Sequence, residues 1–212
     1  MKHHDTPEKS YDLERLIFFS DGVFAIAITL LVIELHPPEH WDGSFDTLFN
    51  AVAAKLIFFF ISFVAIGLYW MAHRFVFRHV QKFSEPAAFL NLLFLCLVCL
   101  TPFANALTSE YGLTPMVFAV YAGLMGAISV MLALLWGYVA LVANLTDPRM
   151  TTAFKWMSLV RVCLSPLIIG GVSMWLGLRF GILPSIGFVV LGGIVSSRIS
   201  LKPFRSEAPE AE

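Results

Sequence analysis

Polar and ionisable side chains interrupt two otherwise apolar stretches of this sequence. Ser20 and Asp21 stand within the first stretch. His73 and Arg74 stand near the end of the second, about one turn after Trp70. A carboxylate inside a bilayer is costly unless it is paired, so an intramembrane Asp marks a functional site or a packed polar network. We predict a bracing network that includes Asp21, Trp70, His73 and Arg74, in which Asp21 pairs with His73 or Arg74 and protonation tunes the site. The alternative is that the second group is an interfacial anchor of aromatic rings and snorkelling bases.

The first apolar stretch has two different faces when it is placed on a helix. With Ile26 at zero and about 100° per residue, a nearly apolar stripe falls within about 40° of Ile26, with Thr29 at its shoulder about 60° away. The other members of the stripe are Arg15, Phe19, Gly22, Leu30 and Ile33. Ser20 and Asp21 point about 120–140° away from the stripe. The stripe faces either lipid or, if several copies surround an axis, a narrow apolar pore that Asp21 braces from behind. The residues alone leave both arrangements open.

These stretches belong to a chain with the composition of a membrane protein. Of its 212 residues, 58% are hydrophobic and 14% are charged, whereas soluble domains have about 45–50% apolar and about 25% charged residues. This balance excludes an ordinary soluble enzyme, a disordered protein and a secreted disulfide scaffold. The apolar runs are continuous rather than alternating, which argues against an outer-membrane β-barrel. We therefore predict an all-α, polytopic membrane protein.

Long apolar runs predict six transmembrane helices. Their ranges are Leu13–Leu35, Leu48–Phe77, Ala87–Leu107, Pro115–Val142, Thr152–Leu176 and Phe180–Val195. Most Lys and Arg residues precede the first span, follow the last, or lie in the connections on that same side. By the positive-inside rule, both termini are cytoplasmic. The chain then consists of a cytoplasmic tail (1–12), a transmembrane domain (13–200) and a disordered cytoplasmic tail (201–212).

The predicted outer side of the protein is acidic. The connection between the first two spans carries four carboxylates and no Lys or Arg beside them; these are Glu34, Glu39, Asp42 and Asp46. One interpretation is a solvated loop that follows the usual orientation rule. The other is an acidic vestibule that raises the local concentration of cations, an effect that oligomerisation would multiply.

The start of the first span resembles that of the transmembrane protein 175 family. The resemblance rests on Arg15-x-x-x-Phe19-Ser20-Asp21 and on the run GVFAIAITLLVIEL that follows it. The six-span plan extends it over nearly the whole chain, except the tails. Members of this family are potassium-permeable channels without the usual potassium filter, and nothing in this sequence resembles TVGYG.

The resemblance implies an architecture and a set of roles. Similarity to the bacterial members implies a homotetramer in the cytoplasmic membrane, in which the first helix of each subunit lines a central pore. The apolar constriction layers of the family fall on Ile26, Leu30 and Ile33, and a layer implicated in ion selectivity falls on Thr29. The resemblance further implies that the motif residues tie helices together near the cytoplasmic end; these are Arg15, Phe19, Ser20 and Asp21.

The function expected from this resemblance is passive, potassium-selective conduction through a pore with a hydrophobic constriction. The main alternative is a proton- or cation-coupled secondary transporter with Asp21 and His73 as its relay, and a non-conducting scaffold is a third class. The sequence carries no signature of an enzyme or of nucleic-acid binding, such as a P-loop, G-x-S-x-G or H-E-x-x-H. We expect no metal site and no cofactor beyond permeant K⁺, and we expect the partners to be further copies of the chain and the bilayer.

Overall fold

A computed structural model describes residues 7–37, 42–112 and 114–164, together with a few single positions between 168 and 191. In these ranges the fold is all-helical, and four helical stretches are long and apolar enough to cross a membrane. They are Tyr11–Glu34, Lys55–Arg78, Glu85–Tyr111 and Pro115–Val142. These stretches correspond to the first four predicted spans. The second half of the fifth span, nearly all of the sixth span and the predicted tail 201–212 lie outside the described residues.

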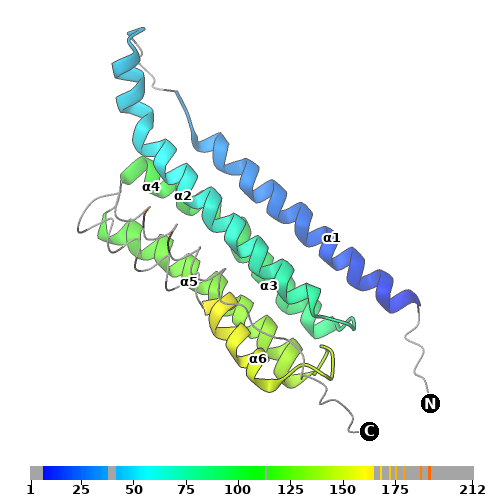
Figure 1. Cartoon of the computed structure of the whole chain (residues 1–212). Helices are drawn as coiled ribbons and strands as arrows, with labels where there is room; N and C mark the ends of the chain where they lie inside the picture. Colours follow the sequence, from blue (N-terminus) through cyan, green and yellow to red (C-terminus); the bar gives the residue numbers. More distant parts are fainter. Residues whose placement is uncertain are drawn as a thin grey trace, which may run out of the picture.

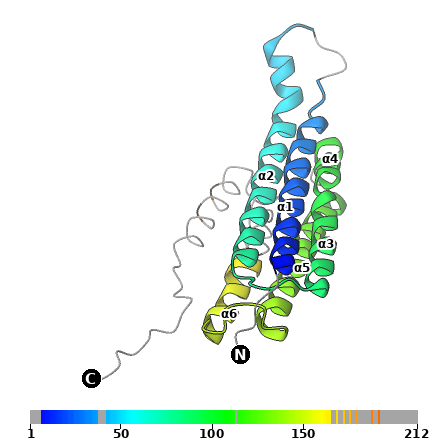
Figure 2. The ribbon, with the colours of Figure 1, turned by 90° about the vertical axis from the view of Figure 1, so that its right-hand side faces the viewer.

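The helices form an elongated bundle. Helix α1 (Pro7–Leu30) continues into a short 3-10 helix, η1 (Leu31–Glu34), and is followed by α2 (Phe45–Arg78). Then come α3 (Glu85–Cys99), α4 (Thr101–Tyr111), α5 (Pro115–Gly137), the π-helical turn η2 (Tyr138–Val142), α6 (Thr152–Ser158) and the π-helical turn η3 (Leu159–Leu164). Helix α1 lies on the outside of the bundle, between α2 on one side and α3 and α4 on the other (Figures 1 and 2). Its N-terminus begins at Pro7, within the segment predicted as a tail.

Three of the described helices, α2, α5 and α6, begin where the sequence supplies capping side chains. Ser44 precedes α2, and its hydroxyl accepts a hydrogen bond from the backbone N–H of Asp46. Thr114 precedes α5 and accepts from Val117, and Thr151 precedes α6 and accepts from Phe154. These side chains satisfy backbone donors that have no partner within the first turn of a helix.

The third predicted span is not one continuous helix. Leu100 separates α3 from α4, and Pro102 stands in the first turn of α4. Proline has no N–H to donate, and its ring clashes with the preceding turn, so a helix bends or breaks where it occurs. The backbone N–H of Leu100 bonds to the carbonyl of Leu97 in a tighter turn at 3.1 Å. The predicted span Ala87–Leu107 is thus confirmed as one membrane-crossing stretch, which a single turn at Leu100 divides into two helices.

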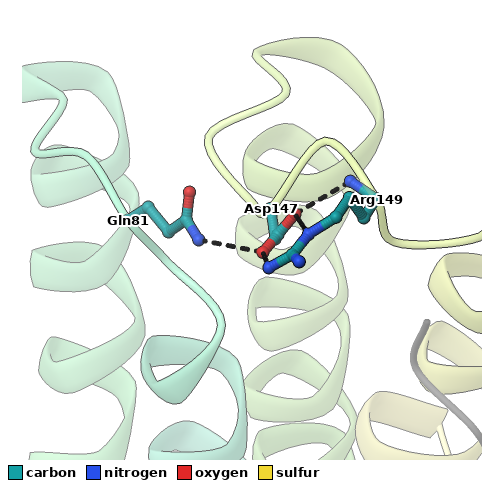
Figure 3. A network of polar contacts seen from close by, with 3 residues as sticks. All are labelled: Gln81, Asp147 and Arg149. Atoms are coloured by element: carbon teal, nitrogen blue, oxygen red, sulfur yellow. Dashed lines mark hydrogen bonds and ion pairs between the residues drawn. The ribbon is translucent and has the colours of Figure 1, made fainter.

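Two loops meet at the end of the bundle near the start of α1. Val80 and Thr146 form a short antiparallel bridge, and the N–H of Gln81 donates to the carbonyl of Leu145 at 2.9 Å. The Gln81 amide also reaches the Asp147 carboxylate, which Arg149 binds at 3.0 Å (Figure 3). These contacts join the connection after α2 to the connection before α6.

At the opposite end, α2 extends beyond its neighbours. It has 34 residues and so a length of about 51 Å at 1.5 Å per residue, against about 30 Å for the hydrocarbon core of a bilayer. The surplus turns project past the other helices, where the chain returns from η1 (Figures 1 and 2). They carry Phe45 and Phe49, whose exposed rings stack at 6.0 Å.

Candidate functional site: the first helix and its braces

The stripe predicted on α1 points away from the subunit's own core. Ile26 is 61% exposed and Ile33 is 60% exposed, and Phe19 and Leu30 are also exposed. On the opposite side of the helix, the packing residues Phe24, Ala27 and Leu31 are buried, with at most 2% of each accessible. Both faces of α1 are therefore largely apolar, but only one of them packs against the rest of the subunit.

Thr29 lies in the exposed sector beside this stripe. Its hydroxyl donates to the backbone carbonyl of Ile26 at 2.9 Å. Because that hydrogen bond uses the proton, the lone pairs of the oxygen remain available on the exposed face. An oxygen presented in this way can accept a hydrogen bond or contact a cation.

A buried hydrogen-bonded chain fixes the packed face of α1 to α2 and α3. The amide nitrogen of Asn91 donates to the Ser20 hydroxyl at 2.9 Å, and its amide oxygen bonds to Nε2 of His73 at 2.8 Å. The Ser20 hydroxyl in turn donates to the carbonyl of Leu16 at 2.8 Å. Ser20, His73 and Asn91 are completely buried. Three helices are thus joined by one asparagine.

Aromatic rings enclose His73. The ring of Phe94 stacks on the imidazole at 5.5 Å between centroids, and the ring of Phe77 lies at 4.6 Å. Phe24, from the packed face of α1, lies at 5.6 Å. Among the described residues, Nδ1 of His73 is buried without a hydrogen-bond partner, and the imidazole is bound through Nε2.

Asp21 is tied to α2 by Trp70, a member of the predicted bracing network, rather than by His73 or Arg74. Its carboxylate accepts a hydrogen bond from the indole N–H of Trp70 at 2.8 Å. The guanidinium of Arg74 stacks over the Trp70 ring at 4.8 Å and, like His73, forms no direct hydrogen bond or ion pair with Asp21 in the described part of the chain. The half-buried indole of Trp70 thus makes the contact with the Asp21 carboxylate that was expected from His73 or Arg74. Asp21 and His73, the relay pair of the transporter hypothesis, bind Trp70 and Asn91 respectively.

The remaining residues predicted for the site are spread along the bundle. Arg15 is exposed and lies over the ring of Tyr11 at 5.6 Å. At the other end, Glu34 is half-buried, whereas Asp42 and Asp46 are exposed. Glu39 lies outside the described residues.

Asp42 has a local structural role in the predicted vestibule. Its carboxylate accepts hydrogen bonds from the Ser44 N–H at 2.9 Å and from the Thr47 hydroxyl at 3.0 Å. These bonds stabilise the charged form, so the pKa of Asp42 lies below its ordinary value of 3.8. Asp42 is therefore a carboxylate that organises the start of α2 and keeps its negative charge.

The sequence analysis missed Asn91, the central residue of the buried chain. It is the one amide in α3, which is otherwise almost entirely apolar. A polar side chain in the middle of a membrane helix faces the protein interior, where it can find a partner. A lone amide in an apolar span therefore indicates a buried polar contact, as an ionisable residue such as His73 does.

Comparison with known proteins places these features in a family. Residues 15–102 match the family model described as the endosomal/lysosomal potassium channel TMEM175. The chain is 34% identical to a potassium channel of Streptomyces collinus over 173 residues, which cover 78% of this chain and 82% of that protein. It is 37% identical to a potassium channel of Chamaesiphon minutus over 143 residues, covering 64% and 70%.

A solved structure and an animal relative extend the comparison. The crystal structure of a lysosomal potassium-selective channel TMEM175 homolog from Chamaesiphon minutus matches with a TM-score of 0.63 and 29% identity, covering 86% of this chain and 98% of that one. The human endosomal/lysosomal proton channel TMEM175 is 33% identical over 127 residues, or 53% of this chain and 25% of the human protein. The relatives thus include proteins named for potassium and a protein named for protons.

Proposed function

The chain belongs to the TMEM175 family of potassium channels, and we propose that it conducts K⁺ passively through a pore lined by α1 of four identical subunits. The family consists of membrane channels and not of enzymes. We place the channel in the bacterial cytoplasmic membrane, with six spans per subunit and both termini in the cytoplasm. The expected positive-inside distribution of Lys and Arg supports this orientation.

One observation carries the proposal: the long apolar face of α1 is exposed while the polar residues of the same helix are held from behind. Ile26, Leu30 and Ile33 are exposed on one side, and Ser20 is buried on the other. A lipid-facing helix would also turn Ser20 and Asp21 inward, so the exposed stripe supports a pore through its combination with membership of a channel family. A pore helix needs to be held in this way, because its position sets the width of the pore.

The constriction would work by excluding water. Rings of Ile26, Leu30 and Ile33 offer no oxygen to replace the hydration shell of an ion, so the pore must widen before an ion passes. Selectivity for K⁺ then depends on pore width, on the Thr29 oxygens and on the smaller cost of stripping water from K⁺ than from Na⁺. The expected discrimination is moderate.

The acidic residues at the other end of α1 support a role in supplying cations. Asp42 and Asp46 are exposed at the start of α2, and Asp42 keeps its charge because its pKa is lowered. Four copies of this cluster around one axis would raise the concentration of cations at the pore entrance. High salt would screen the effect.

Substituting Ile26 with Asn tests the proposal. Polar side chains would wet the narrowest ring, so we expect Ile26→Asn to raise single-channel conductance several-fold and to bring the K⁺/Na⁺ permeability ratio closer to one. The measurement is planar-bilayer recording of the purified protein. A matched control is Val130→Asn on α5, where an aliphatic residue is 49% exposed but lies on a different helix; it should leave both quantities unchanged.

The same preparation separates the competing functions. In liposomes with only a K⁺ gradient, a channel gives a large uncoupled flux, a coupled transporter gives a slow flux that depends on a second ion, and a scaffold gives none. A reversal potential that follows the proton gradient rather than the K⁺ gradient would assign the conductance to protons. Unchanged currents in Ile26→Asn would remove α1 from the pore.

A further inference from the structure

A second group of polar side chains is buried where the third span is broken. Thr101 and Asn105 stand one turn apart on α4, directly after the break at Leu100, and both are completely buried. Their spacing of four residues places them on the same face of the helix. The break follows the 15 residues of α3, which is about 22 Å into the span and within the hydrocarbon depth.

One side of this group is already hydrogen-bonded. The hydroxyl of Ser62 on α2 donates to the amide oxygen of Asn105 at 2.9 Å. The same hydroxyl lies 3.1 Å from that of Tyr121 on α5, which can donate to it. The contact thus joins α2, α4 and α5 and fixes one end of the Asn105 amide.

The other side of the group has no partner. The amide nitrogen of Asn105 and the hydroxyl oxygen of Thr101 are both buried and form no hydrogen bond within the described part of the chain. Buried polar atoms are nearly always paired with protein or with ordered water, because leaving one unpaired loses its hydration without compensation. Two unpaired groups one turn apart therefore call for a shared partner.

We propose that Thr101 and Asn105 hold an ordered water molecule at the break between α3 and α4. A water oxygen accepts from the Asn105 N–H, and a water proton reaches the Thr101 oxygen, so one molecule satisfies both groups. A cation does not fit this donor set, since the Asn105 amide nitrogen can only donate. Water also serves if the amide is turned over, because it donates as well as accepts.

The site lies where a change would reach the first helix. Helix α4 contacts η1 and α1 as well as α2 and α5. A bound water would keep the polar face of α4 satisfied at the point where Pro102 interrupts the backbone ladder. The inference concerns this packing, and it stands or fails independently of which ion the protein conducts.

The sign of one thermal shift tests the proposal. Thr101→Val has nearly the same shape but no hydroxyl. If a water is bound, the valine takes away one of its partners and the melting temperature in detergent should fall by about 2–4 °C. If no water is bound, the valine removes an unpaired buried hydroxyl and the melting temperature should stay or rise, which would overturn the proposal.

Two further variants calibrate this shift. Thr101→Ser keeps the hydroxyl and should keep most of the wild-type melting temperature. Thr108→Val removes a hydroxyl that donates to the backbone carbonyl of Asn105 at 2.7 Å, so it measures the loss of one bond that is already made within α4. A fall for Thr101→Val as large as that for Thr108→Val, with Thr101→Ser unchanged, supports the site.

A cryo-EM map tests directly whether the water is present. A cryo-EM map of the channel in nanodiscs that resolves ordered water should contain a peak within hydrogen-bonding distance of the Thr101 hydroxyl and the Asn105 amide. Such a peak should be absent from the Thr101→Val map. A wild-type map in which the Thr101 hydroxyl bonds directly to a backbone carbonyl, with no peak beside it, would refute the proposal.

Discussion

The membrane-spanning stretch Tyr11–Glu34, which consists of most of α1 together with η1, is held in the bundle by different forces in its two halves. In the N-terminal half, Ser20 bonds to Asn91 of α3 and Asp21 bonds to Trp70 of α2. In the C-terminal half, the buried residues are Phe24, Ala27 and Leu31, which make apolar contacts. Beyond Asp21, no side chain in the described part of α1 or η1 hydrogen-bonds to another helix.

We call the part held by the hydrogen bonds of Ser20 and Asp21 the base of α1, and the part beyond it, which is held by apolar packing, the arm. Hydrogen bonds are directional and hold one register, whereas apolar packing is non-directional and tolerates small shifts. The predicted constriction residues Ile26, Leu30 and Ile33 all lie in the arm. The hydrogen bonds thus hold the helix near its predicted cytoplasmic end, whereas the residues of the proposed constriction lie where only apolar contacts hold it.

Removing Asn91 should break the fixed base most severely. Asn91→Leu keeps the branched skeleton of heavy atoms but leaves His73 and Ser20 without their shared partner in a buried site. We expect a loss of about 2–3 kcal/mol in unfolding free energy and a smaller fraction of assembled channel, because unpaired buried groups lose their hydration without compensation. The measurements are thermal unfolding and size-exclusion chromatography in detergent.

The neighbouring position provides the control for Asn91. Leu92 is exposed on α3, so Leu92→Ala should change neither stability nor assembly appreciably. If Asn91→Leu were as stable as wild type, the two halves of the stretch Tyr11–Glu34 would not differ as described.

Replacing Trp70 should loosen the base by a smaller amount. Trp70→Phe keeps an aromatic ring beside Arg74 but removes the N–H that binds the Asp21 carboxylate. We expect a loss of about 1 kcal/mol, because one hydrogen bond to a half-buried carboxylate is removed. Channel currents should also change, since α1 is no longer held in register.

A second tryptophan distinguishes these two effects. The indole of Trp136 also donates a hydrogen bond, but to the backbone carbonyl of Lys155 in α6 and away from α1. Trp136→Phe should reduce stability and leave single-channel currents unchanged. Equal effects of both variants on the currents would contradict the assignment of Trp70 to the base.

Sequence reasoning succeeded where a signal is local and periodic. Continuous apolar runs predicted the first four membrane-crossing helices, and the period of 3.6 residues placed Ile26 and Ser20 on opposite faces of α1. Both outcomes follow from helix geometry and from burial of one face, which need no knowledge of the neighbouring helices. The structure confirms these helices and the separation of the two faces.

The partners of the polar residues could not be predicted in the same way. Asp21 was expected to pair with an ionisable residue, yet it binds Trp70, and His73 binds Asn91. Which side chain arrives within 3 Å depends on the axial offset and rotation of two helices, and a single sequence contains neither. Pro102, by contrast, is a plain signal for a helix break, but the strongly apolar run around it suggested one unbroken span.

A loop contact provides the smallest expected effect and compares a partly exposed ion pair with the buried bonds at the base of α1. Asp147 binds Arg149 and Gln81, but it lies in the connection before α6, and the side chain of Arg149 is 74% exposed (Figure 3). The hydrogen bonds from Arg149 hold the pKa of Asp147 below its ordinary value of 3.8. Its contribution to stability is therefore complete above that value and is lost as the pH falls through the lowered pKa.

Asp147→Asn should lower the melting temperature only slightly at pH 7, since water screens an ion pair whose Arg149 side chain is exposed. The difference in melting temperature from wild type should shrink further in acid. A loss at pH 7 as large as that of Trp70→Phe would show that the loop contact, and not only the buried bonds, holds the bundle in register.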